Sequence, residues 1–228
     1  MRDYLVENNL KSTEQIEVIP SCVDFSRVEK STKPKEKGKR FEIVYADSAT
    51  GLYLLKKMGQ FFLALKQHKL EAFFQVRTAS PPQFVTDTFS ELEIDRDDFR
   101  VAKVSPDEVP KYLKQTDLGI FFRKPTFAQI ASSPTKIPEY LACGLPVVSN
   151  YGIGDTDTLF ENEGVGICLK NFDEAELAMA SLEIIRLLSD VEIPEKCVDV
   201  AHRYFDLVNV GGLGYKYVYG RLMTNNSS

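Results

Sequence analysis

The chain has 228 residues, enough for one large domain or two small ones, and its 43% hydrophobic and 27% charged content is typical of globular proteins. The formal charge of -5 argues against general electrostatic binding of nucleic acid, because such binding depends on neutralised phosphates. No apolar run approaches the length of a membrane span, and residues 1–15 lack the apolar centre of a signal peptide. We therefore expect a cytoplasmic protein.

Residues 1–40 precede the first predicted strand. They divide into a short polar helix or turn, an apolar stretch over 16–20, and a charged stretch over 27–40 that has seven basic and two acidic residues. Because the charged stretch has no hydrophobic periodicity, we interpret it as a mobile connecting loop. Its basic residues leave open a contact with anionic lipid or phosphate.

From residue 41 onward, short β-rich runs alternate with longer helical segments. Strands are predicted at 41–46, 72–76, 99–104, 117–122, 146–150 and 164–168. Helices are predicted at 52–66, from Pro81 onward behind Ser80, and at 105–115, 134–143, 173–188, 194–203 and 206–223. The connections are too long for hairpins, so the strands should be parallel and joined by right-handed crossovers. The sequence thus predicts a doubly wound α/β sheet of the Rossmann-like kind.

Ligands of such sheets bind outside the carboxyl ends of the strands, where helix N-termini converge. The loops at that edge are 47–51, 77–80, 103–105, 123–135 and 150–155. We expect the binding site among them.

Cysteine and histidine usage favours neither a metal site nor a disulfide. The cysteines are Cys22, Cys143, Cys168 and Cys197. They form no CxxC pair and have no histidine at metal-ligand spacing, so we interpret them as free thiols. The two histidines, His68 and His202, lie in no recognisable catalytic setting, and we expect no histidine-dependent acid-base chemistry.

The stretch from residue 132 to 150 is the most informative part of the chain. The hydroxyls of Ser132, Ser133 and Thr135 can cap the helix near residue 134, which leaves free N–H groups at the ligand edge. Lys136 and Glu139 are three residues apart and share a helix face, so Lys136 suits a diphosphate and Glu139 suits a ribose or sugar diol. The alternative is a surface ion pair of little energetic consequence.

Other residues near this stretch are interpreted as structural. Gly144 should end the helix in a left-handed conformation, and Pro146 should begin the next strand. Tyr140, Phe121 and Phe122 are predicted to be core residues.

The segment SSPTKIPEYLACGLPVVSNYGIGD, residues 132–155, resembles the donor-binding signature of retaining family 4 glycosyltransferases of the GT-B fold. IEVIPSCVD resembles that family's entry into its C-terminal domain, EVPKYLKQTDLGIFF its helix and strand before the signature, and YFDLVNVGGLGYKYVYGRLM its closing helix. The resemblance covers nearly the whole chain but only half of such an enzyme. It implies a linker remnant over 1–40, a nucleotide-sugar-binding domain over 41–205, and a closing helix over 206–228.

The resemblance also assigns roles to individual residues. Glu139 matches the second glutamate of the family's pair of glutamates separated by seven residues, which implies contact with the donor ribose. The first glutamate would fall at position 131, where this chain has Ala131. Ser133, Pro134 and Thr135 would offer backbone or hydroxyl donors near the sugar and the phosphates.

After the first strand, many members of the family carry an arginine and a lysine that neutralise the diphosphate. This chain has ADSATGLY there, without a cation. The small residues of this loop can approach phosphate through N–H and hydroxyl groups; they are Ser48, Ala49, Thr50 and Gly51. The charge would then be met by Lys136 and next by Arg77 and Arg123, each beyond a strand end, while Val104 and Ser105 would meet the base through main-chain groups.

The function implied is that of a retaining hexosyltransferase that uses a UDP-linked or GDP-linked sugar. Lys136 and Glu139 are its predicted catalytic pair, and no metal is expected because the chain has no Asp-x-Asp element. The acceptor, a saccharide or glycolipid, would bind through an N-terminal domain, and contact with the inner face of the membrane is left open. This chain alone is expected to bind donor without turnover.

Three alternatives remain at this point. Ala131 would fit a nucleotide-sugar-binding module without activity. A nucleotide-sugar 2-epimerase shares the fold but needs acid-base residues that the chain does not show. A receiver-like domain needs an acidic cluster after the first strand, where the chain has Asp47 alone.

Overall fold

The computed structural model describes residues 1–28, 40–68 and 71–225. Within them, six parallel strands form one sheet in the order β3-β2-β1-β4-β5-β6. The strands are β1 (Phe41–Ala46), β2 (Ala72–Arg77), β3 (Phe99–Ala102), β4 (Leu118–Phe121), β5 (Val147–Asn150) and β6 (Gly166–Leu169). The predicted doubly wound, Rossmann-like α/β sheet is confirmed.

The register of the central strands places the ligand edge of the sheet. β1 pairs with β2 over its whole length, with Ala46 opposite Arg77, and on its other side it pairs with β4, with Ile43 opposite Leu118. The chain runs outward from β1 to β3 and then returns to β4, so the strand order reverses between β1 and β4. The ligand-binding crevice of such a sheet is therefore expected near the carboxyl ends of these two strands.

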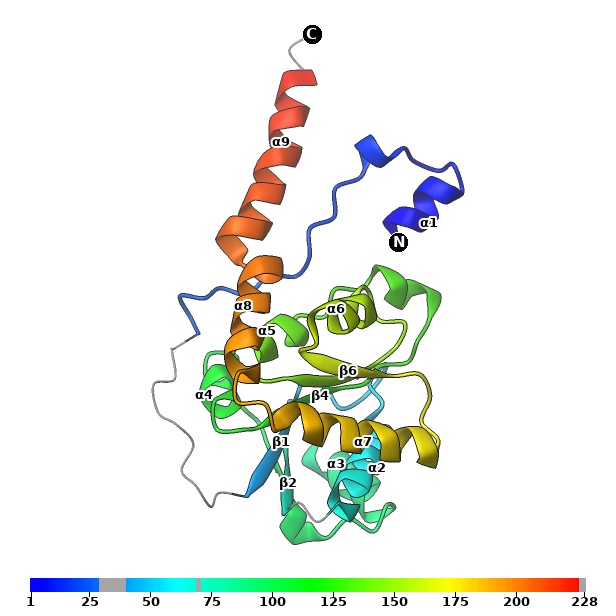
Figure 1. Cartoon of the computed structure of the whole chain (residues 1–228), viewed down its shortest axis with the longest axis vertical. Coiled ribbons are helices and arrows are strands. Elements are labelled where there is room, and N and C mark those ends of the chain that lie inside the picture. Colours follow the sequence, from blue (N-terminus) through cyan, green and yellow to red (C-terminus); the bar gives the residue numbers. More distant parts are fainter. Residues whose placement is uncertain (29–39, 69–70, 226–228) are drawn as a thin grey trace.

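Helices cover both faces of the sheet (Figure 1). One face carries α2 (Leu55–Gln67), α3 (Pro82–Ser90) and α7 (Glu174–Leu188), and α2 contacts both of the others. The other carries α5 (Lys136–Ala142) and α6 (Thr156–Glu163), and α8 (Ile193–Phe205) packs against α5. Single turns of 3-10 helix lie at Thr13–Gln15 and Arg96–Asp98, and a longer one at Phe127–Ala131.

The core forms where the apolar strands meet these helices. Phe121, Phe122 and Tyr140 are fully buried, as predicted. The Tyr140 hydroxyl accepts a hydrogen bond from the Ala46 N–H at 2.9 Å, and burial raises the pKa of Tyr140, which keeps the hydroxyl protonated near neutral pH. This bond ties α5 to the end of β1. Gly144 follows α5 with φ of +77°, in the left-handed conformation predicted for it.

The helix α4 (Val109–Leu113) begins later than predicted. Residues 105–108 form a turn instead, in which the Ser105 hydroxyl donates to a Glu108 carboxylate oxygen at 2.8 Å. This local bond offers the backbone an alternative to helix, as serine often does.

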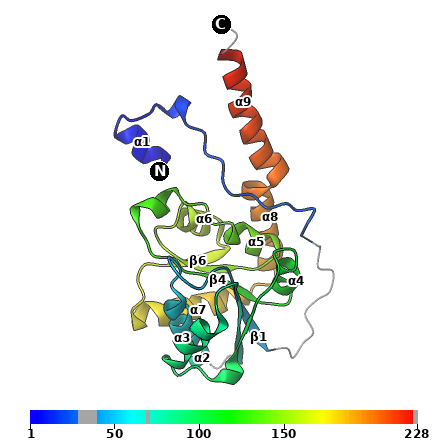
Figure 2. The same cartoon turned by 180° about the vertical axis from the view of Figure 1, so that it is seen from behind.

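The N-terminal segment and the C-terminal helix both lie outside the sheet (Figures 1 and 2). The helix α9 (Leu213–Asn225) projects from the body, and α1 (Arg2–Glu7) opens the N-terminal segment that passes beside it. The Arg221 guanidinium donates to the Glu14 carbonyl at 2.7 Å. Within the described residues, no helix is both long enough and apolar enough to cross a membrane.

The predicted closing helix is interrupted near its start. A π-helical turn at Leu207–Gly212 precedes α9, and Asp206 caps that turn by accepting hydrogen bonds from the N–H groups of Val208 and Asn209 at 2.8 and 2.7 Å. Val23 of the N-terminal segment bonds both neighbours of Asp206 through the backbone. Most of the predicted connecting loop over 27–40 lies outside the described residues, and the domain boundaries stay predictions.

Candidate functional site

Hydroxyl groups gather at the carboxyl ends of β1 and β2. The Ser48 hydroxyl lies 3.3 Å from that of Thr50 and 3.4 Å from that of Ser80. The Ala49 N–H donates to the Ser80 hydroxyl at 3.0 Å, and the Ser48 N–H donates to the Asp47 carboxylate at 2.7 Å. The Thr50 N–H also donates to the Ser48 hydroxyl, at 3.4 Å. Three of the backbone donors predicted to meet phosphate thus have partners within the protein, whereas the hydroxyls can still contact a ligand. The sequence predicted that Ser80 lies in an edge loop and before a helix, but it did not indicate the place of Ser80 in this hydroxyl cluster.

A cavity of about 460 Å³ opens beside these hydroxyls. We call it the carboxyl-end cavity; it is lined by Ala46, Asp47, Ser48, Arg77, Thr78, Ala79, Ser80, Val104, Pro106, Val109 and Lys136. Four predicted site residues meet here from separate parts of the chain: Ser48, Arg77, Val104 and Lys136. The loops after β1, β2 and β3 and the start of α5 therefore converge as a doubly wound sheet requires.

The Arg77 guanidinium lies at this cavity, and only some of its N–H donors have hydrogen-bond partners. Its guanidinium lies 4.2 Å from the centre of the Tyr112 ring and donates to the Gln75 side-chain oxygen at 2.5 Å. Its buried Nε has no hydrogen-bond partner among the described residues. Burial lowers the pKa of Arg77, but an arginine stays charged at neutral pH. Arg77 thus keeps an unused donor and a full charge beside the hydroxyl cluster.

Lys136 and Glu139 form an ion pair at the edge of the same cavity. The Lys136 ammonium lies 2.8 Å from a Glu139 carboxylate oxygen, and the side chains are 18% and 33% exposed. Lys136 lines the carboxyl-end cavity, whereas Glu139 lines a second one. The predicted pair is therefore brought together, with its cation and its carboxylate facing two neighbouring spaces.

The second cavity, of about 540 Å³, shares Pro106 and Val109 with the first, and we call it the adjoining cavity. Its remaining lining is Cys22, Val23, Asp24, Arg27, Val28, Asp107, Pro110, Leu113, Glu139, Cys143 and Leu207. Burial raises the pKa of the Cys143 thiol to about 12, so this group is neutral at physiological pH. Residues 22–28 contribute to this wall from a part of the chain distant in sequence, so no local pattern predicts their place here.

Arg123, the third predicted cation, lies outside the described lining of both cavities. Its guanidinium donates to the Ser132 hydroxyl at 3.0 Å and lies 5.0 Å from the centre of the Tyr53 ring. Its backbone N–H donates to the Asn150 side chain at 2.9 Å. Arg123 thus connects the end of β4 to the segment before α5, a supporting role that the sequence did not predict.

The predicted side-chain caps of α5 are wrong. Among the described residues no side chain caps this helix, and its first turn begins at Lys136 rather than at Pro134. The Ser132 hydroxyl accepts from Arg123, and Ser133 pairs with Ser21, whose N–H donates to the Ser133 hydroxyl at 2.8 Å. Thr135 occupies the cap position without a capping bond. These hydroxyls have tertiary partners, which compete with capping and which the local sequence does not reveal.

The backbone near α5 depends on a glycine that sequence reasoning did not single out. Gly154 has φ of +54°, and a Cβ there would lie 2.0 Å from the Ser132 carbonyl oxygen. Its N–H donates to the Gln129 carbonyl at 2.8 Å. Only glycine fits this approach. Ala131 is exposed at the end of the 3-10 helix Phe127–Ala131, whose five residues include no carboxylate.

The described residues contain no group of three or more histidine, cysteine, aspartate or glutamate side chains arranged to hold a metal ion. The carboxyl-end cavity is lined by hydroxyls, the two cations Arg77 and Lys136 and the carboxylate of Asp47, and the Glu139 carboxylate lies at its edge. Such groups can bind an anion next to a polyhydroxyl group.

The chain has the fold of the C-terminal half of GT-B glycosyltransferases. No protein-family model and no curated protein matches its sequence. A glycosyltransferase from Rickettsia africae ESF-5 is similar over 98% of this chain and 62% of its own, with a TM-score of 0.76 and 16% identity. Sucrose-phosphate synthase from Thermosynechococcus elongatus is similar over 98% and 56%, with a TM-score of 0.68 and 15% identity.

HepE of Anabaena, solved in complex with UDP and glucose, is similar over 96% of this chain and 60% of its own, with a TM-score of 0.68 and 16% identity. The chain thus spans roughly three fifths of the length of these three proteins. At such identities the similarity establishes the fold.

Proposed function

We propose that the chain is the donor-binding domain of a retaining glycosyltransferase that transfers a sugar from a nucleoside diphosphate sugar to an acceptor hydroxyl. The observation that carries the proposal is the convergence of Lys136 and Arg77 on the hydroxyls of Ser48 and Ser80 in the carboxyl-end cavity. The fold shared with a glycosyltransferase and with HepE of Anabaena, which was solved with UDP-glucose, supports the same proposal.

The two neighbouring cavities suit the two polar parts of such a donor. In our proposal the diphosphate occupies the carboxyl-end cavity, where its oxygens accept hydrogen bonds from Lys136, Arg77 and the hydroxyls. The ribose lies at the boundary, where Glu139 accepts hydrogen bonds from its diol. Donor binding then exchanges the Lys136 to Glu139 ion pair for two new charge-assisted contacts, one for each partner.

The same groups supply the chemistry. As the anomeric bond breaks, negative charge grows on the departing diphosphate, and the fixed cations Lys136 and Arg77 stabilise that charge. The acceptor, a saccharide or glycolipid, would be positioned by a further domain. Orienting two reactants supplies about 7 to 11 kcal/mol of barrier lowering, which one domain alone does not provide. We therefore expect this chain to bind donor and to transfer no sugar by itself.

A thermal-shift panel of UDP-, GDP-, ADP- and dTDP-linked sugars tests the proposal and identifies the base. One nucleotide class should raise the melting temperature, because a ligand that binds only the folded state stabilises it. Replacing Lys136 by alanine should abolish the shift, whereas the exposed Lys124, outside both cavities, provides the matched control Lys124→Ala. No shift with any nucleotide sugar at millimolar concentration would refute donor binding.

Ala131 favours a second candidate, a nucleotide-sugar-binding module without transferase activity. The two candidates predict the same binding and differ in turnover. Sugar transfer by a longer protein that contains this chain, lost in its Lys136→Ala variant, supports the enzyme, and binding without any transfer supports the module.

A further inference from the structure

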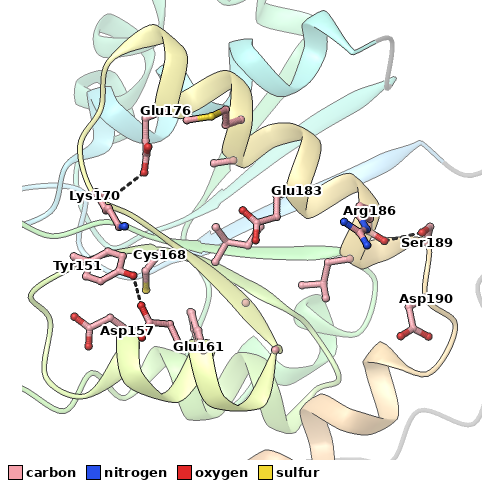
Figure 3. A pocket seen from close by; sticks show the side chains of 17 residues that line it. Tyr151, Asp157, Glu161, Cys168, Lys170, Glu176, Glu183, Arg186, Ser189 and Asp190 are labelled. Atoms are coloured by element: carbon pink, nitrogen blue, oxygen red, sulfur yellow. Dashed lines mark hydrogen bonds between the residues drawn. The ribbon is translucent and has the colours of Figure 1, made fainter.

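A groove of about 840 Å³ runs along the free edge of β6, and none of its lining residues belongs to the carboxyl-end or adjoining cavity (Figure 3). β6 is the last strand of the sheet and pairs with β5 alone among the described strands. The helices α6 and α7 form the two walls, with β6 between them (Figure 3). We call this feature the edge groove.

The edge of β6 presents backbone groups to this groove. The Val165 and Leu169 carbonyls accept hydrogen bonds from β5 and the residue after it, at 3.3 and 3.0 Å. Backbone groups of a parallel strand alternate in direction, so the N–H and C=O groups of Gly166 and Cys168 point away from β5. The next N–H in this alternation, that of Lys170, is bound by a Glu176 carboxylate oxygen at 2.8 Å. Two residues of β6 thus offer an open ladder that ends at Glu176.

The walls of the groove are strongly acidic, whereas the strand is uncharged. Five carboxylates line it, against the two cations Lys170 and Arg186; they are Asp157, Glu161, Glu176, Glu183 and Asp190. None of the five belongs to a salt bridge within the described residues. Figure 3 shows Glu183 on the α7 wall and Glu161 and Asp157 on the α6 wall. Met179, 59% exposed, adds apolar surface.

We propose that the edge groove binds an extended, lysine- or arginine-rich peptide segment of a partner, which adds to β6 as a further strand. Backbone pairing with Gly166 and Cys168 gives affinity for an extended chain, as in other cases of strand addition. The alternating side chains of that chain point toward α6 and α7, where the carboxylates select for positive charge. A second copy of this chain is disfavoured as occupant, because it would bring the same acidic walls against each other. The inference is independent of donor binding.

The test uses a synthetic peptide of alternating lysine and threonine, seven residues long and blocked at both ends. Calorimetry at low salt should detect binding, and hydrogen exchange should slow at the amides of Gly166 and Cys168. The same peptide N-methylated at every backbone amide should bind at least tenfold more weakly, because it keeps the charge but cannot pair as a strand. A glutamate and threonine peptide should not bind.

Protein variants separate the charge of the walls from the backbone ladder. The double variant Glu183→Gln with Asp190→Asn should weaken peptide binding by about threefold to tenfold, whereas Glu174→Gln, on the same helix but outside the groove, should leave it unchanged. Unchanged circular dichroism and melting temperature confirm that each variant is folded. Equal binding of the N-methylated peptide, unchanged exchange at Gly166 and Cys168, or no binding of the basic peptide at millimolar concentration would each overturn the proposal.

Discussion

The carboxyl-end cavity and the edge groove belong to one sheet but carry opposite charge. The cavity is lined by two cations, Arg77 and Lys136, and one carboxylate, Asp47. The groove is lined by five carboxylates and two cations. The cavity lies where strands end, and the groove lies where β6 lacks a neighbouring strand. At both places, backbone N–H and C=O groups are not used by hydrogen bonds of the sheet.

The difference shows that the fold decides where ligands can bind and the side chains decide which ones. Parallel strands leave a crevice at their carboxyl ends and an open ladder at each edge. Cations and hydroxyls make the crevice suitable for an anion, whereas carboxylates make the edge of β6 suitable for a cationic chain. The formal charge of -5 for the whole chain predicts the local charge of neither region.

The largest expected effect comes from Gly154→Ala, which should disturb the backbone where Gly154 packs against Gln129 and Ser132, ahead of α5. The new Cβ would lie 2.0 Å from the Ser132 carbonyl oxygen at a φ of +54°, so we expect a loss of roughly 3 kcal/mol in unfolding free energy. Urea unfolding measures this loss. The control is Gly51→Ala, which has a similar positive φ but meets nothing within 4 Å and should cost about 1 kcal/mol. Equal losses would mean that the contact with Ser132 is not the cause.

Lys136→Ala should remove much of the charge that faces the diphosphate. Calorimetry with a nucleoside, its monophosphate and its diphosphate should show a loss of about 1.5 to 3 kcal/mol for the diphosphate and almost none for the nucleoside, since charged hydrogen bonds are lost. Lys124→Ala should change neither. A uniform loss for all three ligands would contradict the assignment of Lys136 to the phosphates.

Glu139→Gln tests whether the ribose binds at the boundary between the carboxyl-end cavity and the adjoining cavity. We expect nucleoside binding to weaken by about 1 to 2 kcal/mol, because the nucleoside carries the ribose that Glu139 is proposed to hold. Diphosphate binding should weaken by less, because Lys136 is freed from its ion pair with Glu139. Unchanged nucleoside affinity in a folded variant would exclude the ribose assignment.

Asp206→Ala tests how much the capping of the π-helical turn, whose Leu207 lines the adjoining cavity, stabilises the fold. The Asp206 carboxylate caps the π-helical turn, and its loss should cost about 1 kcal/mol in unfolding free energy, with Asp206→Asn retaining most of it. Hydrogen bonds from the Asn209 and Val208 N–H groups hold the pKa of Asp206 below its ordinary value of 3.8. The part of the stabilisation that depends on the ionised carboxylate is therefore present above that value and is lost as the pH falls through the depressed pKa. Urea titrations at neutral pH and below pH 4 should show the difference from Asp206→Ala shrinking in acid; a constant difference would contradict the capping role.

Much of the fold could be predicted from the sequence, because alternating strand and helix periodicities report on buried faces. The parallel sheet, the convergence of Ser48, Arg77 and Lys136, and the left-handed Gly144 all followed from local patterns. The start of α4 did not, because the Ser105 to Glu108 bond competes with helix at that position.

Features that depend on tertiary contacts could not be predicted. The partners of Ser132 and Ser133 lie 9 and 112 residues away in the chain, so no local pattern shows that these hydroxyls are engaged. The same holds for the wall that residues 22–28 give to the adjoining cavity. The edge groove was missed because its carboxylates come from α6, α7 and the segments that flank them, and each looks like an ordinary solvated charge until β6 places them together.

The most direct test of donor binding at the carboxyl ends is a titration of the isotope-labelled chain with UDP and with GDP, followed by backbone amide NMR. We predict that one nucleotide changes the amide chemical shifts of residues 48–50, 77–80 and 136–139, while those of Gly166 and Cys168 in the edge groove stay unchanged. Shifts confined to the edge groove, or no shift with either nucleotide at several millimolar, would contradict it.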